Sequence, residues 1–125
     1  MVNYVAGKSP TYWWPVVVRR PDPETPGHLV EQTFTALLVP KGQDELLEEA
    51  ERIQGIVDLR KRMVAEREAL AAKVAGWRDI LDADGELVPF SRDALMAELQ
   101  KPEVRTGIYR AIAESASGEE ARLGN

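Results

Sequence analysis

The sequence contains no cysteine and only one histidine among its 125 residues. Without cysteine, the chain can form no disulfide, no thiolate nucleophile and no cysteine-based zinc site. The histidine, His28, lies in a proline-rich stretch and has no obvious polar partner nearby in the sequence. Because a catalytic histidine needs an orienting neighbour, we interpret His28 as a loop residue without a chemical role.

Long hydrophobic runs and strongly basic stretches are also missing. No segment approaches the roughly 20 consecutive apolar residues that span a membrane, and residues 1–10 do not fit a secretory signal. The net charge is −5, and the basic clusters Arg19-Arg20 and Arg60-Lys61-Arg62 are short. A nucleic-acid-binding domain normally has a dominant basic face, because neutralising phosphates supplies much of its affinity. We therefore expect neither a membrane nor a nucleic acid as a partner.

The common motifs of enzymes and metal sites are absent as well. No serine has the G-x-S-x-G context of a hydrolase nucleophile, and no glycine-rich phosphate loop is present. Alternating carboxylates from Asp82 onward suggest a calcium loop, but its sixth position is Leu87 instead of glycine and its twelfth is Asp93 instead of glutamate. We expect no enzymatic activity, no cofactor and no bound metal.

Residues 1–40 have the character of β-structure. Val16–Arg19 and Leu29–Val39 are rich in β-branched residues, and the prolines between them cannot continue either strand. Consecutive strands joined in this way usually pair as an antiparallel hairpin. In the second strand, Val30 and the alternate residues from Phe34 to Leu38 share one apolar face. We expect that face to pack on helices.

Residues from Asp44 to about Leu81 have the pattern of a helix, with Asp44 as its cap. Apolar side chains recur at helical spacing, and the charged residues between them indicate an opposite, solvated face. One helix of this length would extend about 57 Å, whereas a compact chain of this size has a diameter of about 36 Å. Either the helix breaks, for instance at Gly55, or part of it projects and needs another chain. Because a projecting amphipathic helix would cover its apolar side on another chain, we expect a homo-oligomer.

The stretch from residue 76 to residue 91 connects this region to two shorter helices. Asp82–Gly85 has the chemistry of a turn, Pro89 prevents a helix from continuing, and Ser91 is placed as a helix cap. Helices are predicted over Ser91–Gln100 and Pro102–Ala116. Trp77 continues the apolar spacing of the long helix, and we assign it to the core.

The sequence therefore predicts an α+β fold in which an N-terminal antiparallel β-hairpin packs on a mainly helical C-terminal two thirds. We expect a single domain over residues 1–125. Its hairpin part covers residues 1–40 and its helical part residues 43–116. Residues 117–125 are small and polar and are expected to form a mobile tail.

Several segments together resemble the tail assembly chaperones of long-tailed bacteriophages, the family of lambda-like minor tail assembly proteins. The resemblance runs from residue 14 to residue 109. It is carried by Gly76-Trp77 with the turn and Val88-Pro89-Phe90-Ser91, by Trp14–Val18 and Glu31–Ala36, and by Pro102–Arg105 with Ile108-Tyr109. The central helical region and Gly118–Asn125 show little of the family pattern.

The resemblance implies a function without catalysis. Such chaperones coat the tape-measure protein in the host cytoplasm and keep its apolar helices soluble. Polymerising tail-tube protein then displaces them, so they are absent from the mature virion. In many members a frameshifted C-terminal extension recruits the tube protein. The alternatives are a structural virion protein, such as a tail-completion or connector subunit, and a small regulator that binds one host protein.

Partner binding in this reading would use apolar surface that the fold leaves uncovered. Three adjacent aromatic residues, Tyr12, Trp13 and Trp14, cannot all face one side of an extended segment, so at least one should be exposed. They are either a plug beneath the helices or interface anchors. The candidate partner-binding residues are the aromatic and apolar positions Tyr12, Trp13, Leu46, Ile53, Met63 and Leu70.

Overall fold

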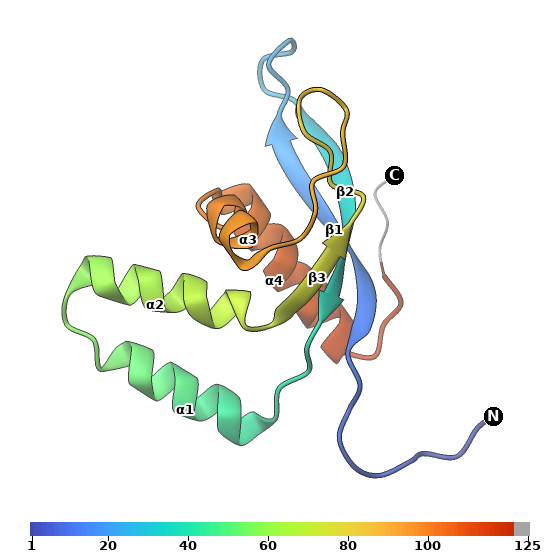
Figure 1. Cartoon of the computed structure of the whole chain (residues 1–125), viewed down its shortest axis with the longest axis vertical. Helices are drawn as coiled ribbons and strands as arrows, with labels where there is room; N and C mark the ends of the chain where they lie inside the picture. Colours follow the sequence, from blue (N-terminus) through green and yellow to red (C-terminus); the bar gives the residue numbers. More distant parts are fainter. Residues whose placement is uncertain (122–125) are drawn as a thin grey trace.

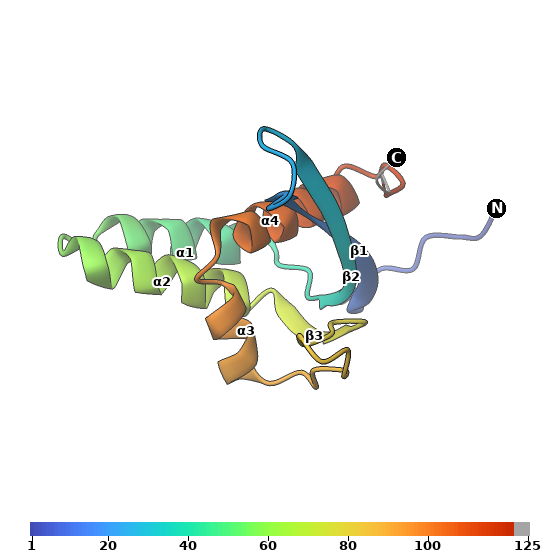
Figure 2. The same ribbon diagram turned by 90° about the horizontal axis from the view of Figure 1, so that it is seen from above.

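The computed structural model describes residues 1–121. The elements follow in the order β1 (Tyr12–Pro21), β2 (Leu29–Leu38), α1 (Gln43–Gln54), α2 (Leu59–Ala71), β3 (Val74–Arg78), α3 (Arg92–Glu98) and α4 (Pro102–Ala116). The strands form one antiparallel sheet in the order β1-β2-β3, and the helices lie on one side of it (Figures 1 and 2). The predicted α+β class is confirmed. The expected tail over 117–125 lies partly outside the described residues.

The N-terminal hairpin forms as predicted, but its first strand is longer and ends at Pro21, a residue that the sequence places in the loop. Its register runs from Tyr12 opposite Leu38 to Pro21 opposite Leu29. The polar loop is closed by the backbone N–H of Asp22, which donates to the carbonyl of His28 at 2.8 Å. The first strand begins at Tyr12 instead of Val16 because the aromatic residues pair with the end of β2.

The core lies between the sheet and α3 and α4. Alternate residues of β1 and β2 supply the sheet's side of this core, as the alternation in the sequence predicts. The helices contribute apolar residues at helical spacing, and α4 lies across β1. The buried residues from these elements are Val16, Val18, Phe34, Ala36, Leu38, Leu95, Leu99, Val104, Ile108 and Ala111.

The prediction of one long helix from Asp44 to Leu81 is wrong. The first helix ends before Gly55, the candidate break position, and the second begins after Asp58. The Asp58 carboxylate accepts a hydrogen bond from the backbone N–H of Lys61 at 2.9 Å and caps the second helix. Asp44 is not a cap, because α1 begins one residue earlier and Gly42 occupies the cap position.

The last part of that predicted helix is instead strand β3. Residues 74–78 pair with Thr35–Leu38, with an irregularity between Leu37 and Leu38. Gly76 is a poor helix former. The backbone N–H and C=O groups at the end of β2 need hydrogen-bond partners, and a strand can supply them whereas a helix cannot. Tertiary pairing therefore overrides an apolar spacing that also fits a helix. Trp77 is a core residue, as predicted, but it lies on a strand.

The connection after β3 has the predicted turn. The Asp82 side chain accepts hydrogen bonds from the backbone N–H groups of Asp84 and Glu86, each at 2.9 Å. Gly85 has φ +80°, a conformation that favours glycine. Trp77 and Phe90 meet edge to face with ring centroids 5.2 Å apart, so the end of this connection packs back onto the core.

The helix cap at Ser91 provides a first test of the fold. The Ser91 hydroxyl accepts a hydrogen bond from the backbone N–H of Ala94 at 3.0 Å. We expect Ser91→Ala to lower the free energy of unfolding by about 1 kcal/mol, as measured by urea denaturation. Ser9→Ala, at an exposed position, is the control and should leave the midpoint unchanged. Equal midpoints for both variants would contradict a stabilising cap.

Candidate protein-binding surfaces

Helices α1 and α2 form a hairpin that projects from the sheet (Figure 1). Helix α1 contains no buried residue, whereas α2 buries side chains mainly in its last turns, next to β3. The ammonium group of Lys73 lies 2.7 Å from the Glu49 carboxylate and ties the middle of α1 to the chain just after α2. The outer part of this hairpin is therefore held by few contacts and remains open to a partner.

Large apolar side chains are exposed along this helical hairpin. Their exposed fractions run from 40% to 91%. We call this set the hairpin surface, and it consists of Leu46, Leu47, Val57, Leu59 and Met63. An exposed apolar set that belongs to one projecting element is typical of an interaction site.

An open groove continues the hairpin surface towards α3. Its volume is about 450 Å³. Leu59, Met63 and Val64 of α2 line it, and Gln100 closes it from the turn between α3 and α4. Arg60 and Arg67 give its rim positive charge, whereas α1 is acidic. The hairpin thus presents apolar side chains flanked by charges of both signs.

The structure places four of the predicted contact residues on the helical hairpin, and three of them are at least partly exposed. Leu46 and Met63 are exposed, and Ile53 is half-buried on α1. Leu70 also belongs to α2, but it is 1% exposed and is part of the core. Its assignment to a partner-facing surface is therefore wrong. The reason is that the end of α2 meets β3 and α3, which cover it.

Tyr12 and Trp13 lie on the sheet and point to opposite faces. Tyr12 is half-buried, and its hydroxyl is 2.7 Å from the hydroxyl oxygen of Ser115 in α4. Trp13 is 43% exposed, and the Arg78 guanidinium lies 3.9 Å from its ring centroid. The expectation that one aromatic of the trio is exposed is confirmed by Trp13. Neither residue belongs to the hairpin surface.

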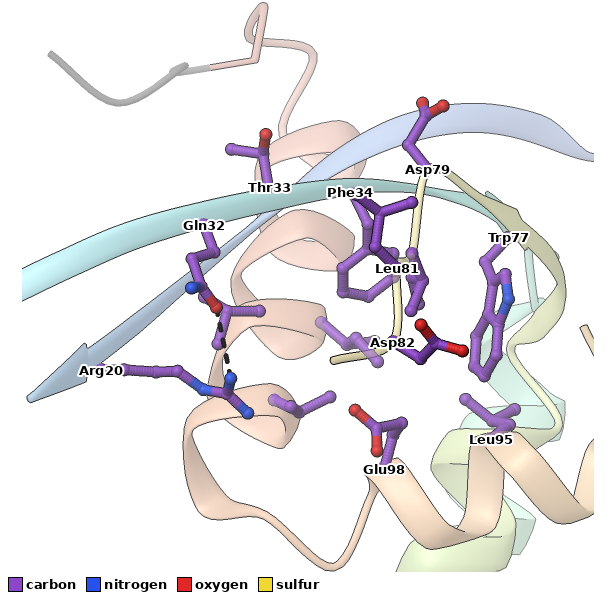
Figure 3. Close-up of a pocket in the computed structure, with 14 residues that line it drawn as sticks. Arg20, Gln32, Thr33, Phe34, Trp77, Asp79, Leu81, Asp82, Leu95 and Glu98 are labelled. Atoms are coloured by element: carbon purple, nitrogen blue, oxygen red, sulfur yellow. Dashed lines mark hydrogen bonds between the residues drawn. The ribbon is translucent and has the colours of Figure 1, made fainter. Parts of the chain in front are cut away.

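A second concave site, which sequence reasoning missed, lies between the sheet and the helices. We call it the cleft, and its volume is about 360 Å³ (Figure 3). Its apolar lining comes from all three strands, the loop after β3, α3 and α4, and includes Val18, Phe34, Trp77, Ile80, Leu81, Leu95, Val104 and Ile108. These residues are up to 90 positions apart, from Val18 to Ile108. No local motif could have indicated the site.

Polar side chains surround the apolar part of the cleft. Asp82 and Glu98 direct their carboxylates towards its centre, and Asp79 points away (Figure 3). Arg20 donates to the Gln32 side chain at 3.2 Å, and its Nε lies 3.4 Å from a carboxylate oxygen of Glu103 without hydrogen-bond geometry.

The charges at this rim are unequally compensated. The Glu98 carboxylate is 3.0 Å from the Lys101 ammonium group. Within residues 1–121, Asp82 forms no ion pair. Its Oδ1 atom instead accepts the two backbone hydrogen bonds of the turn. The rim therefore retains negative charge.

One tyrosine in the middle of α4 has a shifted pKa. Burial raises the pKa of the Tyr109 hydroxyl above its ordinary value, and the nearby charge of Glu66 raises it further. The group is half exposed, so water screens part of this effect. Tyr109 therefore stays protonated near neutral pH and acts as a neutral hydroxyl on the surface.

The described residues contain no other site of recognisable chemistry. Across residues 1–121, no group of three or more histidine and acidic side chains is arranged to hold a metal ion. The helices in this range are too short or too polar to cross a membrane. Comparison of the chain with family models, with curated proteins and with solved structures gave no match.

Proposed function

We propose that this protein is a phage tail assembly chaperone that binds the tape-measure protein through the hairpin surface. The observation that carries the proposal is helix α1, which has apolar side chains on a projecting element but buries none of them. A helix of this length is only marginally stable alone, and most helical stability comes from packing an apolar face. A partner that covers Leu46 and Leu47 would supply that packing.

The resemblance over residues 14–109 supports the choice of partner. A tape-measure protein exposes apolar helices before the tail tube surrounds it, and a second helical element with an exposed apolar face can cover them. The charges on both sides of the hairpin surface suit amphipathic helices. Displacement by tail-tube protein requires a modest interface, because small interfaces dissociate readily. The proposed site of action is the host cytoplasm, and the proposed protein is absent from the mature virion.

A double variant tests this function without disturbing the fold. Leu47 and Met63 are 56% and 48% exposed, so Leu47→Ser/Met63→Ser should change the free energy of unfolding by less than about 1 kcal/mol. We expect the wild-type chain to keep the co-expressed tape-measure protein in the soluble fraction and to be recovered with it by pull-down. The double variant should lose most of this effect.

The matched control carries the same change on exposed leucines outside the hairpin surface. Leu29 and Leu87 are 60% and 69% exposed, and Leu29→Ser/Leu87→Ser should retain solubilisation. A tape-measure protein that is equally soluble without this chain would overturn the chaperone proposal. Stoichiometric amounts of the chain in purified virions would favour a structural tail protein instead.

A further inference from the structure

Residues 1–11 form an extended arm that leaves the sheet, and the side chains of this arm are not packed against the rest of the protein. Every residue of the arm is exposed, and it points away from the molecule (Figures 1 and 2). Val2, Tyr4 and Val5 are 92%, 89% and 85% exposed. These residue types favour strands. The arm carries one lysine, Lys8, and no acidic residue.

The cleft offers such a segment both apolar contacts and an open strand edge. The ladder between β2 and β3 covers only Thr35–Leu38. Within the described residues, the first part of β2, Leu29–Phe34, therefore has a ladder partner only on the β1 side. Gln32, Thr33 and Phe34 from this part of β2 line the cleft. An extended segment that enters there can add backbone hydrogen bonds to β2 while its side chains enter the apolar cleft.

Charge also favours the arm as the occupant. The carboxylates of Asp82 and Glu98 face the cleft, and Asp82 is not neutralised by an ion pair within residues 1–121. The arm bears Lys8 and no acidic residue, so this negative rim attracts it electrostatically. The same rim would repel the acidic helix α1 of a second copy as an alternative occupant.

We propose that the arm of one copy of this protein docks in the cleft of a second copy as an added strand next to β2. The arm leaves β1 at Tyr12, whereas the cleft is formed at the other end of β1, at Val18 and Arg20. The arm also points away from its own cleft. The arm can therefore enter the cleft of a second copy directly, whereas to enter its own cleft the chain would have to reverse its direction. This self-association does not depend on the proposed function, because it uses neither the hairpin surface nor the tape-measure protein.

The absence of cysteine makes a direct test possible, since single cysteines can be placed on an unreactive background. Leu81 lines the cleft and is 59% exposed. We expect Tyr4→Cys mixed with Leu81→Cys to form a mixed disulfide under mild oxidation. Tyr4→Cys mixed with Leu47→Cys is the matched control, because Leu47 is 56% exposed but lies on α1. The control pair should form much less of the mixed disulfide.

Two results of this experiment would overturn the proposal. One is equal cross-linking to Leu81→Cys and Leu47→Cys, which would show random collision. The other is a disulfide that forms within single molecules of a Tyr4→Cys/Leu81→Cys double variant at high dilution, while the two mixed single variants form no disulfide with each other. That result would place the arm in its own cleft.

An equilibrium measurement gives the size of the effect. We expect sedimentation of the full chain to show concentration-dependent association. Val2→Ser/Tyr4→Ser/Val5→Ser should raise the dissociation constant about a hundredfold. This variant cannot fail through misfolding of the body, because the three side chains are almost fully exposed. An unchanged dissociation constant, or a wild-type chain that stays monomeric at high concentration, would overturn the proposal.

The same measurement separates this proposal from the proposed function. Leu47→Ser/Met63→Ser should leave the dissociation constant unchanged, because these residues lie on the helical hairpin. The arm variant should weaken self-association. A loss of self-association with Leu47→Ser/Met63→Ser but not with the arm variant would assign the contact between copies to the hairpin surface and overturn the arm proposal.

Discussion

Replacement of Trp77 by alanine is expected to lower the free energy of unfolding by about 3–5 kcal/mol. The side chain is 7% exposed, although it lies on a short strand next to an irregular loop. Its ring meets Phe34 and Phe90 edge to face, with centroids 6.5 Å and 5.2 Å apart. Its indole N–H donates to the Val88 carbonyl at 2.8 Å and holds the loop after β3 against the core.

A graded series separates the two contributions of this residue. Trp77→Phe keeps an aromatic ring but removes the donor to the Val88 carbonyl. We expect it to cost about 1 kcal/mol, because a half-buried acceptor loses its partner. Trp77→Ala loses the aromatic contacts as well. Urea denaturation followed by circular dichroism measures all variants on one scale.

The control for this series is the exposed tryptophan of the sheet. Trp13 is 43% exposed and rests against Arg78, so Trp13→Ala should cost clearly less than Trp77→Ala. Since a domain of this kind has a total stability of about 5–15 kcal/mol, Trp77→Ala can leave the chain largely unfolded. In that case Trp77→Phe still gives the direction of the effect. A folded Trp77→Ala variant with the wild-type midpoint would contradict the packing described here.

The parts of the fold that sequence reasoning predicted are those specified by local chemistry. Alternating apolar residues placed Phe34, Ala36 and Leu38 on one face of β2, and the structure buries all three. Ser91 and Pro102 mark the starts of α3 and α4 because caps and first-turn prolines act within a few residues. Such features depend on neighbours in the sequence, which is why one sequence suffices to find them.

The parts that could not be predicted depend on contacts between distant segments. Val74, Trp77 and Leu81 fit a helical spacing, but four of the residues of β3 are paired with the end of β2, about 40 positions earlier. Because residues 74–78 form strand β3 instead of continuing a helix, β3 covers the end of α2, and Leu70 is buried. The cleft is assembled from all three strands and two helices, so its existence follows only once the chain path is known.

Gly107→Ala is expected to destabilise the protein by about 2 kcal/mol or more, although alanine is the better helix former. In an exposed helix this change would stabilise by about 1 kcal/mol. Here α4 crosses β1 so closely that a Cβ atom at residue 107 would lie 2.6 Å from the carbonyl oxygen of Val17 and 3.2 Å from a methyl carbon of Val16. The nearest atom belongs to the backbone of β1, which cannot move aside by a change of rotamer, so α4 must shift. Overpacking of this kind typically costs about 1–3 kcal/mol.

Gly55→Ala provides the opposite expectation with the same chemical change. At Gly55 the backbone has φ −73°, and a Cβ atom would lie 3.5 Å or more from its nearest neighbours. This substitution should be neutral or stabilise by about 0.5 kcal/mol, because alanine restricts the unfolded chain. Thermal or urea unfolding of both variants decides the matter, and a raised midpoint for Gly107→Ala would show that α4 is not held against β1 as described. Because Val104 and Ile108 of α4 line the cleft, a displaced α4 should also weaken docking of the arm, whereas Gly55→Ala should leave that docking unchanged.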